Sequence, residues 1–254
     1  MMLQQLPIDA FVHYFGENLE SSHQEYYWPV GQSGKSQAEL LIPEFKWHTP
    51  SGGSDECIAL KHHLTAKWET ADLPERRLLA RWIVAGWGGV RTNREETLEA
   101  HLAMSLDENS NKPLKGVASY SKILSVVDCK KYAIYDARVA ACLNAVQLYT
   151  EAKSPVFFRY IPSRNGEFKS YGREDNFIKI FSKETLVGTK KEIASGIRKW
   201  TEVEPDHTYS TYLHLLNTMK KYFPGKELYH FEMALFSAAP FLCAELAKKH
   251  YARL

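Results

Sequence analysis

The sequence lacks the features that mark several large classes of protein. No apolar run in its 254 residues approaches the roughly 20 residues that a transmembrane helix requires. The first twenty residues contain no basic segment followed by an apolar one, so we expect no secretory leader and a cytoplasmic protein. Repeats and low-complexity tracts are also missing, and the composition, 44% apolar and 24% charged, is that of a globular protein. The length fits one large domain or two small ones.

Metal and nucleotide motifs are missing as well. The four cysteines lie far apart without a CxxC pair, which argues against a zinc knuckle, an iron–sulfur cluster or a dense disulfide framework. The ten histidines form no HExxH motif and no recognisable three-ligand set. Gly34-Lys35-Ser36 is similar to the end of a P-loop, but Pro29 stands where that motif needs a glycine. We therefore expect neither a metal nor a cofactor.

Positive charge is concentrated in the middle of the chain. Residues 111–200 contain 17 lysines and arginines against 8 acidic residues, whereas the rest of the chain contains 15 against 22. A basic segment in an otherwise acidic chain favours a polyanion-binding face. The alternative is a solvated surface whose charges cancel in three dimensions.

The periodicity of apolar residues predicts a mainly α fold. Residues 1–70 are expected to form an irregular section with some helices, packed on a helical body over residues 71–254. In that body Asp72 is an N-cap and Pro74 a first-turn proline for a helix that ends near Gly86. Further helices are expected after residue 93, after a candidate cap at Ser121, after Asp136, and roughly over 188–200, 208–222 and 227–251.

Three features follow one another between residues 114 and 143. Leu114-Lys115-Gly116-Val117-Ala118 forms a glycine-containing turn, Lys122 lies at the start of the next helix, and Asp136 caps the helix after that. This order resembles the helix-hairpin-helix DNA glycosylases, the superfamily that includes the 8-oxoguanine glycosylases. Over residues 76–150, WIVAGWGGVRTN and SYSKILSVVDCKKYAIYDARVA look like a bacterial 8-oxoguanine-glycosylase-fold group that occurs in phage-defence gene clusters.

The chain departs from the superfamily pattern at the hairpin. Lys115 replaces the hairpin proline and Ala118 replaces its second glycine. The superfamily's lysine would fall nearer Tyr120, and the spacing from Lys122 to Asp136 is shorter than usual by about one helical turn. Lys115 therefore remains the alternative nucleophile.

The resemblance implies a helix-hairpin-helix glycosylase-like fold, DNA as partner, no membrane, and partner proteins from a defence gene cluster. It gives Lys122 the role of nucleophile and Asp136 that of electrostatic stabiliser. The residues expected to contact DNA are Lys115, Gly116, Val117, Ala118, Ser119, Ser121, Arg138, Arg159 and Arg164. The aromatic residues expected to contact an extruded base are Tyr132, Tyr135, Phe157 and Phe158.

The chemistry explains why a lysine and an aspartate belong together. A carboxylate stabilises the positive charge that develops on the sugar when an N-glycosidic bond breaks. A neutral lysine amine attacks C1′, expels the base and forms a Schiff base, from which the strand can be cleaved. Burial lowers a lysine pKa and makes the neutral amine available.

Simpler interpretations stay open for each of these residues. An aspartate before an alanine-rich helix is most often only an N-cap, and a lysine in a first turn is usually a solvated charge. Phe157 and Phe158 fit equally well as anchors that hold residues 154–176 to the core. At the level of function, the alternatives are a non-catalytic module that binds modified bases and a fold used only for protein contacts.

Overall fold

Helices make up nearly all the regular structure in the computed structural model, which describes residues 6–48, 52–90, 93–104, 111–159, 161 and 200–251, with the backbone alone for 247–251. In chain order the elements are α1 (Ile8–Gln24), α2 (Gln32–Leu41), α3 (Ser54–Thr70), α4 (Leu73–Arg81), η1 (Trp82–Trp87), α5 (Glu95–Leu102), α6 (Val117–Val127), α7 (Ala137–Tyr149), β1 (Val156–Phe157), β2 (Thr201–Glu202), η2 (Pro205–His207), α11 (Thr208–Tyr222) and α12 (Leu228–Tyr251). The two short strands pair in parallel, with Val156 opposite Thr201. The prediction of a mainly α chain is confirmed.

Several helix boundaries follow from local signals in the sequence. Asp72 and Glu75 form a reciprocal capping box at the start of α4, and a proline lies in its first turn. Asp136 caps α7, as predicted. In contrast, α6 begins before the predicted cap at Ser121, because Gly116 adopts a left-handed conformation (φ 83°) that turns the chain into the helix at Val117. The helix predicted over 188–200 lies outside the described residues except for residue 200.

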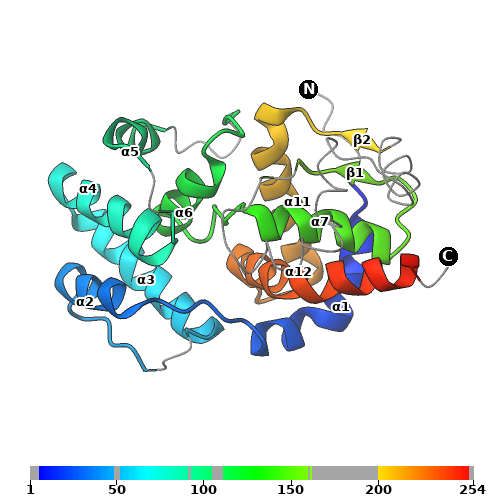
Figure 1. Cartoon of the computed structure of the whole chain (residues 1–254), viewed down its shortest axis with the longest axis horizontal. Helices are drawn as coiled ribbons and strands as arrows, with labels where there is room; N and C mark the ends of the chain where they lie inside the picture. Colours follow the sequence, from blue (N-terminus) through cyan, green and yellow to red (C-terminus); the bar gives the residue numbers. More distant parts are fainter. Residues whose placement is uncertain are drawn as a thin grey trace.

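The core has two parts. One hydrophobic cluster is built mainly from α1, α7, α11 and α12, and the other from α2, α3, α4, η1 and part of α5. Figure 1 shows the first group at one end of the molecule and α2 to α5 at the other. Helix α6 belongs to both clusters, because Tyr120 and Leu124 pack in the first while Ile123 and Val126 pack in the second.

The first 70 residues are more regular than the sequence indicates. Their described part, residues 6–48 and 52–70, forms three helices, of which α1 packs against α12 and α7, while α3 packs against α6. The amphipathic pattern of α3 is weak because it buries two charged residues, Glu56 and Lys61. In the described parts of the chain, no helix has the length and apolar character needed to span a bilayer.

Candidate functional site

Lys122 and Asp136 line one pocket at the junction of the two hydrophobic clusters. Lys122 comes from α6, and Asp136 is the residue that immediately precedes α7. The other residues around the pocket are Tyr26, Trp28, Trp87, Ile134, Val139, Glu232 and Phe236. Lys122 and Asp136, which are 14 positions apart in the sequence, thus line the same small pocket as aromatic side chains from three other segments.

The Lys122 side chain is almost completely buried, with 3% of its surface exposed. Its Nζ donates a hydrogen bond to the carbonyl oxygen of Ala118, at 2.7 Å, one turn earlier in α6. Burial lowers the pKa of the Lys122 amine, although the negative charges of Asp136 and Glu232 partly oppose this effect. Lys122 is therefore placed to lose its proton more readily than an ordinary lysine.

The Asp136 carboxylate serves as the N-cap of α7. Its Oδ1 accepts hydrogen bonds from the backbone N–H groups of Arg138 and Val139, at 2.9 and 3.0 Å. A carboxylate at this end of a helix also lies in the favourable field of the helix dipole. The capping role is confirmed, and it coexists with a position in the wall of the pocket.

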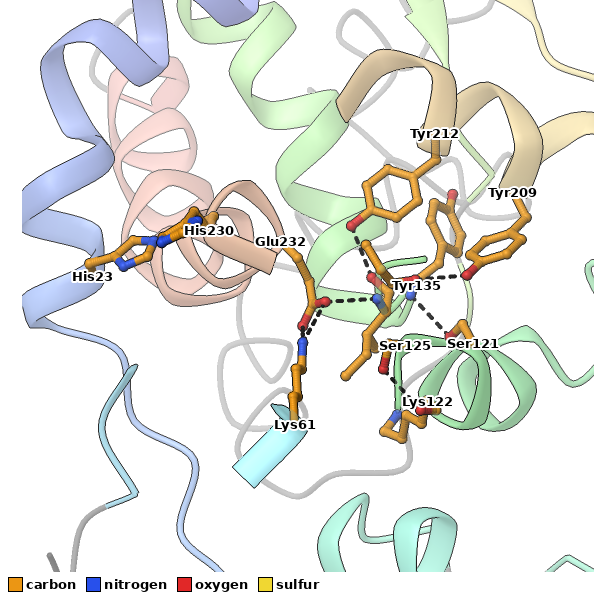
Figure 2. A network of polar contacts seen from close by, with 12 residues as sticks. His23, Lys61, Ser121, Lys122, Ser125, Tyr135, Tyr209, Tyr212, His230 and Glu232 are labelled. Carbon is orange, nitrogen blue, oxygen red and sulfur yellow. Dashed lines mark hydrogen bonds and ion pairs between the residues drawn. The ribbon is translucent and has the colours of Figure 1, made fainter. Parts of the chain in front are cut away.

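Side chains from α6, α11 and α12 hold the backbone just before Asp136 (Figure 2). The hydroxyls of Tyr209 and Tyr212 donate to the carbonyl oxygens of residues 133 and 134, at 2.9 and 3.0 Å. Ser121 Oγ accepts the N–H of Tyr135 at 3.1 Å, and Glu232 Oε2 accepts the N–H of residue 134 at 2.9 Å. These four bonds fix the segment that carries Asp136 into the pocket.

Glu232 also forms a buried ion pair with Lys61, which Figure 2 shows. Lys61 Nζ lies 2.8 and 3.0 Å from the two Glu232 carboxylate oxygens. Both side chains are at most 4% exposed. A buried pair of this kind seldom gains stability over apolar residues of similar size. Its two charges act on the pKa of Lys122 in opposite directions, since Glu232 raises it and Lys61 lowers it.

The predicted hairpin lies between α5 and α6. Gly116 supplies its left-handed residue, and Lys115 and Gly116 are exposed, whereas Ala118 is half-buried. Val117, Ser119 and Ser121 are buried, and the Ser121 hydroxyl is occupied by the Tyr135 N–H. The side chains of these three residues therefore do not face an external DNA strand.

The three predicted DNA-binding arginines fall in different settings. Arg138 is half-buried with its guanidinium 4.5 Å from the centre of the ring of Phe236, a residue that lines the pocket. Arg159 lies 3.5 Å from Glu202, and the two side chains are each about one-third exposed. Arg164 lies outside the described residues.

The four aromatics predicted to contact a base do not line the pocket. Tyr132, Tyr135, Phe157 and Phe158 are each at most 2% exposed and belong to the first hydrophobic cluster. The Tyr135 hydroxyl donates to the carbonyl of Arg159 at 2.7 Å, which ties the segment after β1 to the core. The alternative interpretation of Phe157 and Phe158 as core anchors describes their positions correctly.

The sequence analysis did not assign the other seven pocket residues to the site: Tyr26, Trp28, Trp87, Ile134, Val139, Glu232 and Phe236. One signal was present in the sequence, because Trp87 lies in the glycine-rich break Gly86–Gly89 at which the predicted helix ends. The structure shows a π-helix at this break, over Trp82–Trp87. Single turns of π-helix occur frequently at functional sites, because the extra residue redirects neighbouring side chains.

The pocket is narrow in this conformation. Its free volume of about 10 Å³ holds roughly one water molecule. A nucleobase can therefore enter only if side chains in the wall move. Among the described residues, no group of three or more histidine, cysteine or acidic side chains is placed to hold a metal ion.

Comparison with family models, curated proteins and solved structures gives no match. The chemical capability of the pocket rests on its own groups: an amine with a lowered pKa, two carboxylates, and aromatic rings that can hold a planar molecule.

Proposed function

We propose that the protein is a DNA glycosylase that cleaves the N-glycosidic bond of an extruded, modified purine. The single observation that carries this proposal is the shared pocket, in which the buried Lys122 amine and the Asp136 carboxylate stand among aromatic side chains. The resemblance to helix-hairpin-helix glycosylases supports the same assignment, since it pairs a lysine after a hairpin with an aspartate one helix later.

In the proposed reaction the neutral Lys122 amine attacks C1′ of the extruded nucleotide, and the N–C1′ bond forms as the bond to the base breaks. The base leaves with the bonding electrons and takes up a proton, which the new ammonium group can supply. A second proton moves from that nitrogen to the ring oxygen as the sugar opens, which leaves a neutral Schiff base between Lys122 and C1′. Asp136 stabilises the positive charge on the sugar during the first step.

One feature supports DNA as the substrate, and a second sets a condition on how DNA would bind. The exposed Lys115, just before α6, offers a positive charge for contact with a phosphate. The narrow pocket excludes an intact duplex, so the target nucleotide has to leave the base stack before it reaches Lys122.

A second candidate is a non-catalytic module that binds modified bases in a bacterial defence system. The observation that favours it is that the Asp136 carboxylate already accepts two backbone hydrogen bonds as the N-cap of α7. The capping role alone explains an aspartate at this position, without a role in catalysis. This module would bind the same base in the same pocket without forming a covalent intermediate.

Borohydride trapping separates the two functions. Wild-type protein is incubated with duplex DNA containing 8-oxoguanine or an abasic site, and borohydride reduces any Schiff base to a stable crosslink. We expect a crosslink that is lost in Lys122→Gln and retained in Lys115→Gln. Loss with Lys115→Gln alone would move the nucleophile to the hairpin. Salt-dependent binding without any crosslink would favour the binding module, and no binding at all would reject nucleic acid as the ligand.

A further inference from the structure

The tryptophans near the pocket differ in how their indole N–H groups are used. Trp28 Nε1 donates to the carbonyl oxygen of Trp87, and Trp82 Nε1 donates to the carbonyl oxygen of Gly34, both at 2.8 Å. Trp87 Nε1 is buried as well, but it has no hydrogen-bond partner. Only 3% of the Trp87 side chain is exposed, so bulk solvent does not supply a partner.

An unpaired buried donor destabilises a folded protein, because the group has lost its water without gaining a replacement. The position of Trp87 is nevertheless well fixed. It ends the π-helix η1, its carbonyl is held by Trp28, and the next residue, Gly88, donates its N–H to the carbonyl of Ile83 at 2.8 Å. The indole is thus held in the wall of the pocket with its polar edge unsatisfied.

We propose that the Trp87 indole N–H donates a hydrogen bond to an acceptor atom on the base that enters the pocket. The inference rests on the proposed function and adds a requirement on the substrate. The base must present a carbonyl oxygen or an unprotonated ring nitrogen toward Trp87, as a purine with oxygen substituents does. A base with only a donor or an alkyl group at that edge would leave the indole unpaired and would bind more weakly.

The other aromatic groups of the pocket are consistent with this role. Trp28 and Phe236 lie with ring centres 5.1 Å apart in an edge-to-face arrangement, and both line the pocket. Aromatic rings hold a planar base without distinguishing one base from another. A directional donor such as the Trp87 N–H therefore supplies discrimination that the rings do not.

The test compares two DNA ligands that differ only in the base. One duplex contains an uncleavable 2′-fluoro-8-oxoguanosine, and the other contains a tetrahydrofuran abasic analogue that has no base. We expect Trp87→Phe, which keeps a ring but removes the N–H, to weaken binding of the first duplex about tenfold and to leave binding of the second unchanged.

Trp47→Phe is the matched control. The Trp47 indole N–H is also buried without a partner, but this side chain packs against the second hydrophobic cluster and is not among the residues that line the pocket. Its replacement should change the affinity for neither duplex. An equal loss on both duplexes in Trp87→Phe, or no loss on the base-containing one, would overturn the inference.

A spectroscopic measurement covers the case in which Trp87→Phe does not fold. The indole ¹H–¹⁵N signal of Trp87 in the wild-type protein should move downfield when the 8-oxoguanine duplex binds, and should stay in place with the abasic analogue. An unmoved signal on a bound base would reject the hydrogen bond and leave the proposed glycosylase standing. Failure of the wild-type protein to bind either duplex would reject both.

Discussion

The side chain of Lys122 lies directly against Gly88, so that a methyl group at residue 88 would stand 2.5 Å from Lys122 Cδ and 2.9 Å from its Cε. The same methyl group would lie 2.7 Å from the backbone carbonyl oxygen of Ile83. Gly88 has an ordinary helical backbone (φ −79°), so the only requirement for glycine here is space. The glycine-rich break after η1 thus makes room for the proposed nucleophile.

Gly88→Ala should displace the Lys122 amine. The alanine methyl cannot be accommodated without movement of Lys122 or of the Ile83 backbone, and overpacking of this kind costs about 1–3 kcal/mol of stability. We expect at least a tenfold loss of borohydride crosslink, in protein shown by thermal unfolding to remain folded. Gly16→Ala is the control, because Gly16 lies within α1 and no atom lies near the methyl group that alanine would add. This substitution should stabilise the folded protein slightly, since alanine favours a helix more than glycine does. A normal crosslink in Gly88→Ala would mean that Lys122 is not the reacting group.

The pH dependence of trapping should report the Lys122 amine. Burial lowers its pKa below the ordinary 10.5, so the crosslinking rate should rise with pH and level off below 10.5 as the neutral amine becomes fully populated. The charge of Asp136 raises this pKa, so Asp136→Asn should move the midpoint to lower pH while slowing base release. The measurement is the rate of crosslinking to abasic DNA across pH. A midpoint that does not move in Asp136→Asn would show that the two groups do not interact.

Local sequence signals were sufficient for the position of Asp136 but not for the pocket around it. A capping aspartate and an alanine-rich helix are read from neighbouring residues, and the predicted cap is present. Glu232 reaches the pocket from α12, and Trp28 reaches it from the segment before α2. Contacts between segments so far apart in the chain leave no pattern in the local sequence. The ion pair with Lys61 spans 171 positions in the sequence.

The aromatic residues show the opposite difficulty. Tyr135 and Phe158 stand near the predicted catalytic residues in sequence and alternate with basic residues, which is a pattern that nucleic-acid contacts and core anchors share. The burial of Tyr135 depends on a distant part of the chain, since its ring packs edge-to-face with Tyr212 from α11. The prediction assigned four aromatic rings to the site because they lie near Lys122 and Asp136 in the sequence. In the fold, these rings are part of the hydrophobic core.

The Lys61–Glu232 pair should be more important for the site than for stability. Glu232→Leu leaves the Lys61 charge buried without a partner and removes the acceptor for the residue 134 N–H, so we expect a loss of about 3–5 kcal/mol. In the double variant Lys61→Met with Glu232→Gln, neither of these two positions carries a charge, and the glutamine oxygen can still accept that N–H. Its stability in urea unfolding should recover most of the loss, while trapping stays impaired. Full trapping in the double variant would remove the pair from the proposed mechanism.

The stability of the fold should fall in mild acid because of His230. Its ring stacks on His23 with centres 5.2 Å apart, and its Nδ1 accepts the N–H of Glu227 at 2.8 Å. Burial, helped by the charges of His23 and Lys226, lowers the pKa of His230 to about 4 from the ordinary 6.5. Between these two values the unfolded chain binds a proton that the folded protein does not, so stability is lost as the pH falls from 6.5 to 4.

His230→Gln should flatten this part of the stability profile, because glutamine does not titrate and its oxygen can accept the same N–H. The measurement is the unfolding midpoint at a series of pH values between 4 and 7. His13→Gln is the control, since His13 is 60% exposed on α1 with only a 3.8 Å contact to Glu17, and it should keep the wild-type slope. If the two variants lost stability in acid equally, the half-buried stack of His23 and His230 would not be the cause. Because His230 and Glu232 lie on the same turn of α12, the crosslinking rate of each variant should be recorded in the same buffers. If crosslinking is lost at the same pH as the folded structure, the loss would be assigned to unfolding that includes α12. If crosslinking is lost at a higher pH, while the protein is still folded, the loss would be assigned to protonation of Lys122.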